Sequence, residues 1–125
     1  NIAQGAACLS AFFLIKDEKL KELAVPSGFS ALLGITEPAM FGVNLKLRYP
    51  FLGAVIGSCA ASIFITYKHV LAQALGAAGL PGIISIRPQN IVSYIIGMLI
   101  SFVISAAVTF VLGKRENIKK QRKAG

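Results

Sequence analysis

A lone carboxylate, Glu37, is the side chain in this sequence best placed to do chemistry. It is the only acid between Glu22 and Glu116, and uncharged, mostly apolar residues flank it on both sides. One carboxylate can accept hydrogen bonds from two neighbouring hydroxyl groups, and bonds to a charged acceptor are stronger than bonds between neutral groups. This chemistry suits a sugar, whose hydroxyls both donate and accept. We therefore predict that Glu37 binds a polyhydroxylated substrate.

Glu37 belongs to the run Gly34-Ile35-Thr36-Glu37-Pro38, which predicts a break in an otherwise apolar stretch. Pro38 lacks a backbone N–H and is expected to push Glu37 out of the helical region, while Gly34 allows a C-terminal turn. Thr36 or Glu37 could cap the free N–H groups of the helix that follows. Pro38 would hold the break, and Thr36 with the backbone of Gly34 and Ile35 would shape the tip around the substrate.

Two other roles for Glu37 stay open. It could cap a helix or pair with a cation outside these 125 residues, and it could couple transport to a proton or another ion. Asn1 and Gln4 lie on the preceding apolar stretch, and both are candidates for lining the same cavity.

The remaining His and Cys residues predict neither a metal site nor a catalytic residue. His69 directly follows an apolar stretch, where it would meet the membrane interface. Cys8 and Cys59 lie among apolar residues with no CxxC spacing and no neighbouring His. We expect both cysteines to be small buried hydrophobic residues.

The composition predicts that Glu37 lies within a membrane protein. Of the 125 residues, 55% are hydrophobic and 14% are charged, and the mean hydropathy is +0.71. A soluble domain has about 45–50% apolar and about 25% charged residues. The net charge of +8 is confined to a few clusters. This pattern excludes a disordered tail, which needs low hydrophobicity, and argues against a soluble nucleic-acid-binding protein.

The elements that position Glu37 are expected to be membrane helices, each of about 20 residues where it spans the bilayer. Pro50 suits a first helical turn, and Gly53 and Gly57 form a small-residue pair that allows close helix contact. The predicted segments are the end of a span at 1–15, a hydrophilic loop at 16–22, a hairpin at 25–45 with half-helices 27–33 and 39–45, a span at 51–66, a broken helix and loop at 70–90, and a last span at 91–112.

The distribution of charge predicts how these segments cross the bilayer. A basic cluster directly after a span marks the cytoplasmic side, so the tail 114–125 is expected inside. Eleven of the 13 Lys and Arg residues then lie inside, against Lys68 and Arg87 outside, provided that segment 25–45 begins and ends on the same side. We therefore expect this segment to be re-entrant, with Glu37 near mid-depth, where irregular backbone must line a cavity or be buried in protein.

The stretch from Gly34 to Leu45 resembles the signature of the membrane-embedded C component (EIIC) of phosphotransferase system (PTS) sugar permeases of the glucose superfamily. The resemblance extends over residues 1–113 and is closest to the sucrose type within the sucrose/trehalose/β-glucoside branch. Four further segments are similar to that branch: Asn1-Ile2-Ala3-Gln4-Gly5, Val25-Pro26-Ser27, Lys46-Leu47-Arg48-Tyr49-Pro50-Phe51 and Gly79-Leu80-Pro81-Gly82. The resemblance implies an all-α integral membrane fold made of transmembrane helices plus a re-entrant helical hairpin. The chain would be the C-terminal part of the EIIC transport domain.

The resemblance also implies how the site works. Glu37 would hydrogen-bond the sugar from the tip of one of two opposed hairpins, assisted by a His on the other. A phosphocysteine on a cytosolic EIIB domain would supply the phosphoryl group, and EIIA would be a further partner. Neither of those motifs is present here, because His69, Cys8 and Cys59 do not match them. We expect no catalytic residue, no metal and no cofactor in this chain, and a homodimer formed by helices outside it.

The expected function is therefore phosphoenolpyruvate-dependent uptake of a disaccharide, most closely sucrose, with coupled phosphorylation. It would take place in the bacterial inner membrane, in a multi-pass protein with its C-terminus in the cytoplasm and no nucleic-acid partner. Trehalose and β-glucosides are alternatives within the family. An ion- or proton-coupled secondary sugar transporter is the rival from another class, because it also uses broken helices around a mid-membrane site.

Overall fold

Helices make up most of the described part of the chain, residues 1–124 of the computed structural model. These residues contain no strand, only an isolated bridge between Ala72 and Ile86. The predicted all-α class is therefore confirmed. In chain order the elements are α1 (Ile2–Phe12), α2 (Glu18–Leu32), α3 (Glu37–Ala39), the π-helical turn η1 (Met40–Asn44), α4 (Leu45–Leu47), α5 (Tyr49–Tyr67), the 3₁₀ helices η2 (Leu80–Ser85) and η3 (Pro88–Asn90), and α6 (Ile91–Ala124).

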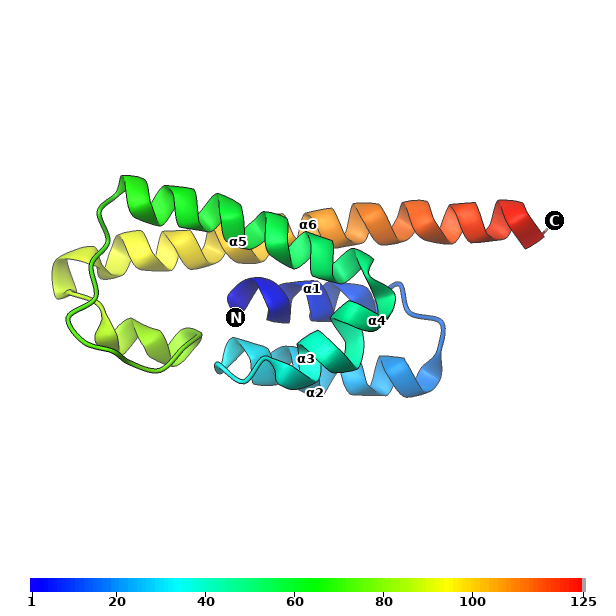
Figure 1. The fold of residues 1–125 in the computed structure, drawn as a ribbon, viewed down its shortest axis with the longest axis horizontal. Coiled ribbons are helices and arrows are strands. Elements are labelled where there is room, and N and C mark those ends of the chain that lie inside the picture. Colours follow the sequence, from blue (N-terminus) through cyan, green and yellow to red (C-terminus); the bar gives the residue numbers. More distant parts are fainter. Residues whose placement is uncertain (125) are drawn as a thin grey trace.

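The helix α1 lies between a long helical pair and a shorter hairpin (Figure 1). On one side it contacts α5 and α6, and Ser105 of α6 donates a buried hydrogen bond from Oγ to the carbonyl of Ala3 at 2.7 Å. On the other side it contacts α2 and η1. The interfaces are lined by alanines that are fully buried, and such small side chains let helix backbones approach closely; they include Ala6, Ala7, Ala11, Ala24 and Ala31.

The α5 and α6 helices run antiparallel and pack along the predicted small-residue face (Figure 1). A Cβ atom on Gly53 would clash with Oγ1 of Thr109, and one on Gly57 would lie 2.6 Å from Cβ of Ser105. Neither position has room for a side chain, so the close contact that the two glycines predicted is confirmed. Pro50 lies in the first turn of α5, also as predicted.

The chain turns back on itself between α2 and α3, so that α2 and the continuous limb α3–η1–α4 form a helical hairpin. Its first limb begins, and its second limb ends, at the same end of the molecule (Figure 1). The turn between them lies part-way along the α5–α6 pair, not beyond it. That this hairpin enters the membrane without crossing it stays a prediction.

The first limb starts earlier than predicted, at Glu18 instead of residue 27, so most of the expected loop 16–22 is helical. Asp17 provides the reason, because its Oδ1 accepts a hydrogen bond from the backbone N–H of Leu20 at 2.9 Å and caps the helix. Glu18 adds a negative charge to the first turn, where the helix dipole favours it. The polarity of this segment therefore reflects exposure to water and not the absence of a helix.

Outside the hairpin, the expectation for Cys59 needs correction. The last span expected at 91–112 lies within α6, and the helix continues through the basic tail to Ala124, because Lys, Arg, Glu and Gln favour helix as strongly as many apolar residues do. Between α5 and α6, the broken helix and loop expected at 70–90 are a segment without helix at 70–79, followed by the short helices η2 and η3. Cys8 is buried as predicted, whereas Cys59 is exposed on α5.

An apolar surface surrounds the α5–α6 pair. The helix α5 and the stretch Pro88–Arg122 are both long and apolar enough to cross a membrane. They expose large apolar side chains, among them Ile63, Leu99 and Val103. In water such a surface would be an aggregation liability, whereas in a bilayer it faces lipid. The structure is therefore consistent with the predicted membrane class.

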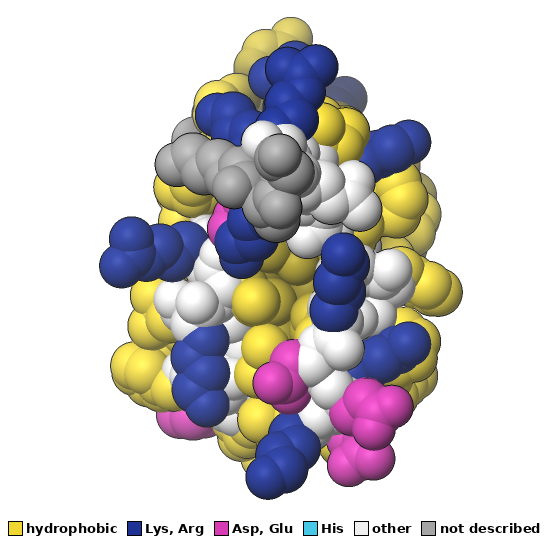
Figure 2. Space-filling view, turned by 90° about the vertical axis from the view of Figure 1, so that its right-hand side faces the viewer, with side chains coloured by type: hydrophobic (Ala, Val, Ile, Leu, Met, Phe, Trp, Pro, Cys, Tyr) yellow, Lys and Arg dark blue, Asp and Glu magenta, His cyan; other side chains and the backbone are white. Residues whose placement is uncertain are grey.

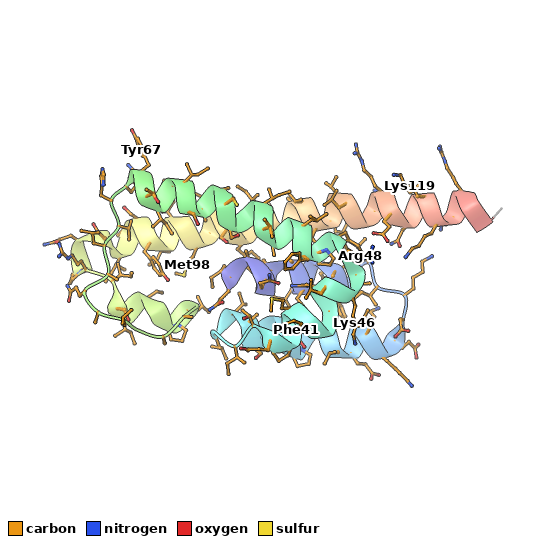
Figure 3. All side chains as sticks on the ribbon, in the orientation of Figure 1. Phe41, Lys46, Arg48, Tyr67, Met98 and Lys119 are labelled. Atoms are coloured by element: carbon orange, nitrogen blue, oxygen red, sulfur yellow. The ribbon has the colours of Figure 1, made fainter. Side chains whose placement is uncertain are left out.

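Cations gather at one end of the molecule. Figure 2 views the end at which α6 finishes and shows Lys and Arg side chains over it, with Asp and Glu at its lower edge. Figure 3 places Lys46, Arg48 and Lys119 in this half and Tyr67 at the far end. This asymmetry is the one expected if the basic end faces the cytoplasm.

Candidate functional site

The tip of the hairpin is a turn held by three internal hydrogen bonds. The N–H of Gly34 donates to the carbonyl of Ala31 and the N–H of Ile35 to the carbonyl of Ser30, both at 3.0 Å, while Oγ of Ser30 donates to the carbonyl of Ile35 at 3.0 Å. The two backbone bonds form the Schellman motif that ends many helices, which needs a left-handed residue after the C-cap. Gly34 occupies that position with φ of 110°. The turn at Gly34 is therefore the one that the sequence predicts.

The second limb begins immediately after this turn, and here the prediction for Pro38 was wrong. Glu37 is already the first helical residue of α3, so Pro38 does not push it out of the helix. Pro38 lies in the first turn, where a missing N–H leaves no helical hydrogen bond unmade. Thr36 occupies the N-cap position but makes no capping bond with its side chain. The break is therefore made by residues 33–36, and Pro38 lies in the first turn of the next helix.

Glu37 is exposed at the tip. It is the first helical residue of α3, so it lies at the start of the second limb, directly after the turn. Ile35 is also exposed, and Thr36 and Gly34 are partly exposed. The turn thus presents one carboxylate, one hydroxyl side chain and several backbone groups at a single place, which is the polar set that a sugar requires.

A second turn of the chain supports this tip from the opposite direction. Gly79, with φ of 73°, lies so close to the hairpin that a Cβ atom there would clash with the carbonyl oxygen of Leu32. A Cβ atom on Gly34 would likewise lie 2.6 Å from the carbonyl oxygen of Ala78. The two turns therefore meet backbone to backbone, and the segment before η2 fixes the tip in place.

Asn1 and Gln4 both lie beside the hairpin but in different surroundings. The side-chain N–H of Asn1 donates to the carbonyl of Gly34 at 3.5 Å. Asn1 also lines an open cleft of about 360 Å³ between α1, α5, α6 and the Gly79 turn, whose other polar side chains are Ser58, Ser62, Tyr94 and Ser101. Gln4 is not among the residues of this cleft and instead accepts hydrogen bonds from Asn44 of η1.

The chain is similar to known proteins along nearly its whole length. A family model described as "Phosphotransferase system, EIIC" matches residues 1–58, which include α1, the whole hairpin and the start of α5. A protein of Pasteurella multocida (strain Pm70), named PTS system sucrose-specific EIIBC component, is 59% identical over 121 residues, which cover 97% of this chain and 26% of that protein. The chain belongs to the EIIC family of the phosphotransferase system.

Two further relatives of this EIIC chain differ in their printed domains and sugars. A PTS system sucrose-specific EIIBCA component of Pediococcus pentosaceus is 50% identical over 115 residues, which cover 92% of this chain and 18% of that protein. A PTS system trehalose-specific EIIBC component of Bacillus subtilis (strain 168) is 49% identical over 110 residues, which cover 88% of this chain and 23% of that protein. The chain thus spans about a quarter or less of these relatives. No solved structure matches it.

Sequence reasoning missed two features of the EIIC hairpin. One is the contact with Ala78 and Gly79, which lie more than 40 residues away along the chain. The other is Asn44, a buried amide in the second limb of the hairpin. The signal for Asn44 was available, because it is the only Asn or Gln between residues 5 and 72. A single amide in the uncharged stretch between Glu37 and Lys46 is expected to have a specific partner.

Proposed function

We propose that this EIIC chain forms the part of a phosphoenolpyruvate-dependent permease that binds sucrose and carries it across the bacterial inner membrane. The observation that carries the proposal is the tip, where the Schellman turn at Gly34 is followed directly by the hydroxyl side chain of Thr36 and the exposed carboxylate of Glu37. The names of two relatives that are 59% and 50% identical support sucrose over trehalose.

The position of the tip supports a role in transport. The basic end of the molecule lies at the base of the hairpin, and the tip lies part-way along the two helices that are long enough to span a bilayer (Figure 1). With its base at the cytoplasmic surface, the hairpin would be re-entrant and Glu37 would lie well below that surface. A carboxylate at such depth is costly unless it serves a function.

Glu37 would accept hydrogen bonds from sugar hydroxyls, and Thr36 with the backbone of Gly34 and Ile35 would complete the polar surface of the tip. Pro38 would start the second limb, and Asn1 would contribute from α1 through the cleft that it lines. These residues bind and orient the sugar. None of them transfers the phosphoryl group.

The phosphoryl group would come from the phosphocysteine of an EIIB domain, and EIIA would phosphorylate that cysteine. The printed names of the EIIBC and EIIBCA relatives support these partners. EIIB would approach from the cytoplasmic side, at the basic end of the molecule. Phosphorylation adds negative charge to the sugar, so the product would not return through an apolar path. We further propose, from the family resemblance, a homodimer formed by helices outside this chain.

Sucrose uptake into membrane vesicles tests this function against ion-coupled transport. Vesicles with the full-length permease should accumulate sucrose phosphate when loaded with phosphoenolpyruvate and the cytosolic phosphotransferase proteins, whether or not an ionophore collapses the membrane potential. Uptake that needs the potential and ignores phosphoenolpyruvate would instead establish a secondary transporter.

Substitution of the carboxylate tests the site itself. A hydrogen bond from a sugar hydroxyl to a charged acceptor contributes about 1.5–3 kcal/mol, so Glu37→Gln should raise the dissociation constant for sucrose about 10- to 150-fold. The matched control is Glu18→Gln, which makes the same change at the base of the same hairpin and should leave the constant unchanged. A change of less than twofold for Glu37→Gln would refute the role of the carboxylate.

A further inference from the structure

Asn44 is a fully buried amide whose Nδ2 donates two hydrogen bonds and whose Oδ1 accepts none within the described part of the chain. Its exposed fraction is 0%, and its Nδ2 donates to Oε1 of Gln4 at 2.6 Å and to the carbonyl of Gln4 at 3.1 Å. Its Oδ1 has no hydrogen-bond partner among the described residues. A buried oxygen without a partner is destabilising, so this residue is not explained by stability alone.

Asn44 is also the last residue of the π-helical turn η1, and this turn changes which side chains of the limb face inward. In a regular α-helix each residue adds about 100°, so residues three and seven positions before Asn44 would lie within about 60° of it. These residues are Phe41 and Glu37, and both would then face α1. In the structure Phe41 is 59% exposed and Glu37 is exposed, whereas Ala39 is 0% exposed.

The wider turn accounts for this difference. A π-helical turn holds about one residue more than an α-helical turn, which rotates the preceding residues by up to about 100° relative to those that follow. The rotation brings Ala39 to the inner face and moves Glu37 outward, toward the exposed side of the tip. Such turns occur frequently at functional sites.

The bond to Gln4 ties this turn to α1. Residues of α1 and its N-cap contact the hairpin at three heights: Asn1 at the carbonyl of Gly34 (3.5 Å), Gln4 at Asn44, and Cys8 through Sγ at the carbonyl of Ala24 (3.3 Å). An apolar side chain at position 44 could pack in more than one rotation of the limb. The Nδ2 of Asn44, in contrast, reaches both oxygens of Gln4 in only one rotation of the second limb. These hydrogen bonds therefore specify how the limb packs against α1.

We propose that Asn44 is a positioning residue, which through its hydrogen bonds to Gln4 holds the π-helical turn in the register that presents Glu37 to the sugar. This inference rests on the proposed function, because it assumes that Glu37 binds the substrate. Asn44 itself does not contact the sugar and acts only through the orientation of the second limb.

The test is a double-mutant cycle read as the dissociation constant for sucrose, measured by isothermal titration of the full-length permease in detergent. Asn44→Leu should raise the constant about tenfold when Glu37 is present. In the Glu37→Gln background the same substitution should change it by less than about twofold, because the group that it positions is already lost.

The matched control is Thr109→Val. Thr109 is also 0% exposed and also has a buried oxygen without a partner, but it lies in the α5–α6 interface and not in the hairpin. Thr109→Val should leave the constant unchanged in both backgrounds. Gln4→Met, which removes only the side-chain acceptor, should repeat the pattern of Asn44→Leu with a smaller effect of about threefold, and it serves as the test if Asn44→Leu does not fold.

The outcomes separate the two proposals. If Asn44→Leu and Gln4→Met weaken binding equally in both backgrounds, or do not weaken it at all, the positioning role is overturned while the role of Glu37 stands. If Glu37→Gln leaves the constant unchanged, the proposed function of the tip fails, and the positioning role fails with it. A loss confined to the background that retains Glu37 supports both.

Discussion

The contact between the two turns at the hairpin tip makes Gly34→Ala an informative substitution. Two effects add at this position. A residue other than glycine at φ of 110° is strained, which costs about 1–3 kcal/mol. The new Cβ would also lie 2.6 Å from the carbonyl oxygen of Ala78, a backbone atom that cannot rotate away as a side chain would. The tip must therefore move relative to the Gly79 turn.

The expected consequence is a local loss of sugar binding with the helices retained. If the movement breaks the hydrogen bond between Glu37 and a sugar hydroxyl, the dissociation constant for sucrose rises about 10- to 150-fold. The assay is isothermal titration of the full-length permease, with helix content followed by circular dichroism. Helix content should not change, because Gly34 lies outside both helices.

Gly42→Ala is the matched control on the same hairpin. A Cβ atom on Gly42 would lie 3.0 Å from Cδ2 of Leu23, the end of a flexible side chain, and Gly42 has no positive φ. It should therefore bind sucrose as the parent protein does. If Gly34→Ala binds sucrose as tightly as Gly42→Ala, the tip does not depend on the backbone contact, and the reasoning about its position is refuted.

Three further substitutions test the packing, each read as thermal unfolding of the full-length permease in detergent. Gly57→Leu should lower the free energy of unfolding by about 1–3 kcal/mol or more, because the new side chain would clash with α6. Ile56→Leu on the exposed face of α5 is the control and should be neutral. Equal effects of the two substitutions would exclude the close helix contact. Ser105→Ala should cost about 1 kcal/mol through the lost bond to α1, and an unchanged midpoint would argue against that bond. Asp17→Ala should cost about 1 kcal/mol through the lost cap of α2, with Lys16→Ala as the silent control.

Local patterns in the sequence predicted the helices better than their ends. The turn at Gly34 and the contact at Gly53 and Gly57 were foreseen, because each depends on a residue type that permits one backbone conformation or one close approach. The beginning of α2 was misplaced, because the charged residues of 16–22 were taken to form a loop. Hydropathy reports the solvent around a helix, whereas caps and propensity decide its length.

Sequence alone was sufficient for the membrane class and the family, because these depend on composition and on a short contiguous motif. Tertiary structure was needed to reveal that the Gly79 turn supports the tip and that Gln4 holds Asn44. These contacts join residues 40 or more positions apart, and their existence depends on the rotation and depth at which whole helices pack. A single wider turn in one helix alters that rotation, and hydropathy along the chain does not encode it.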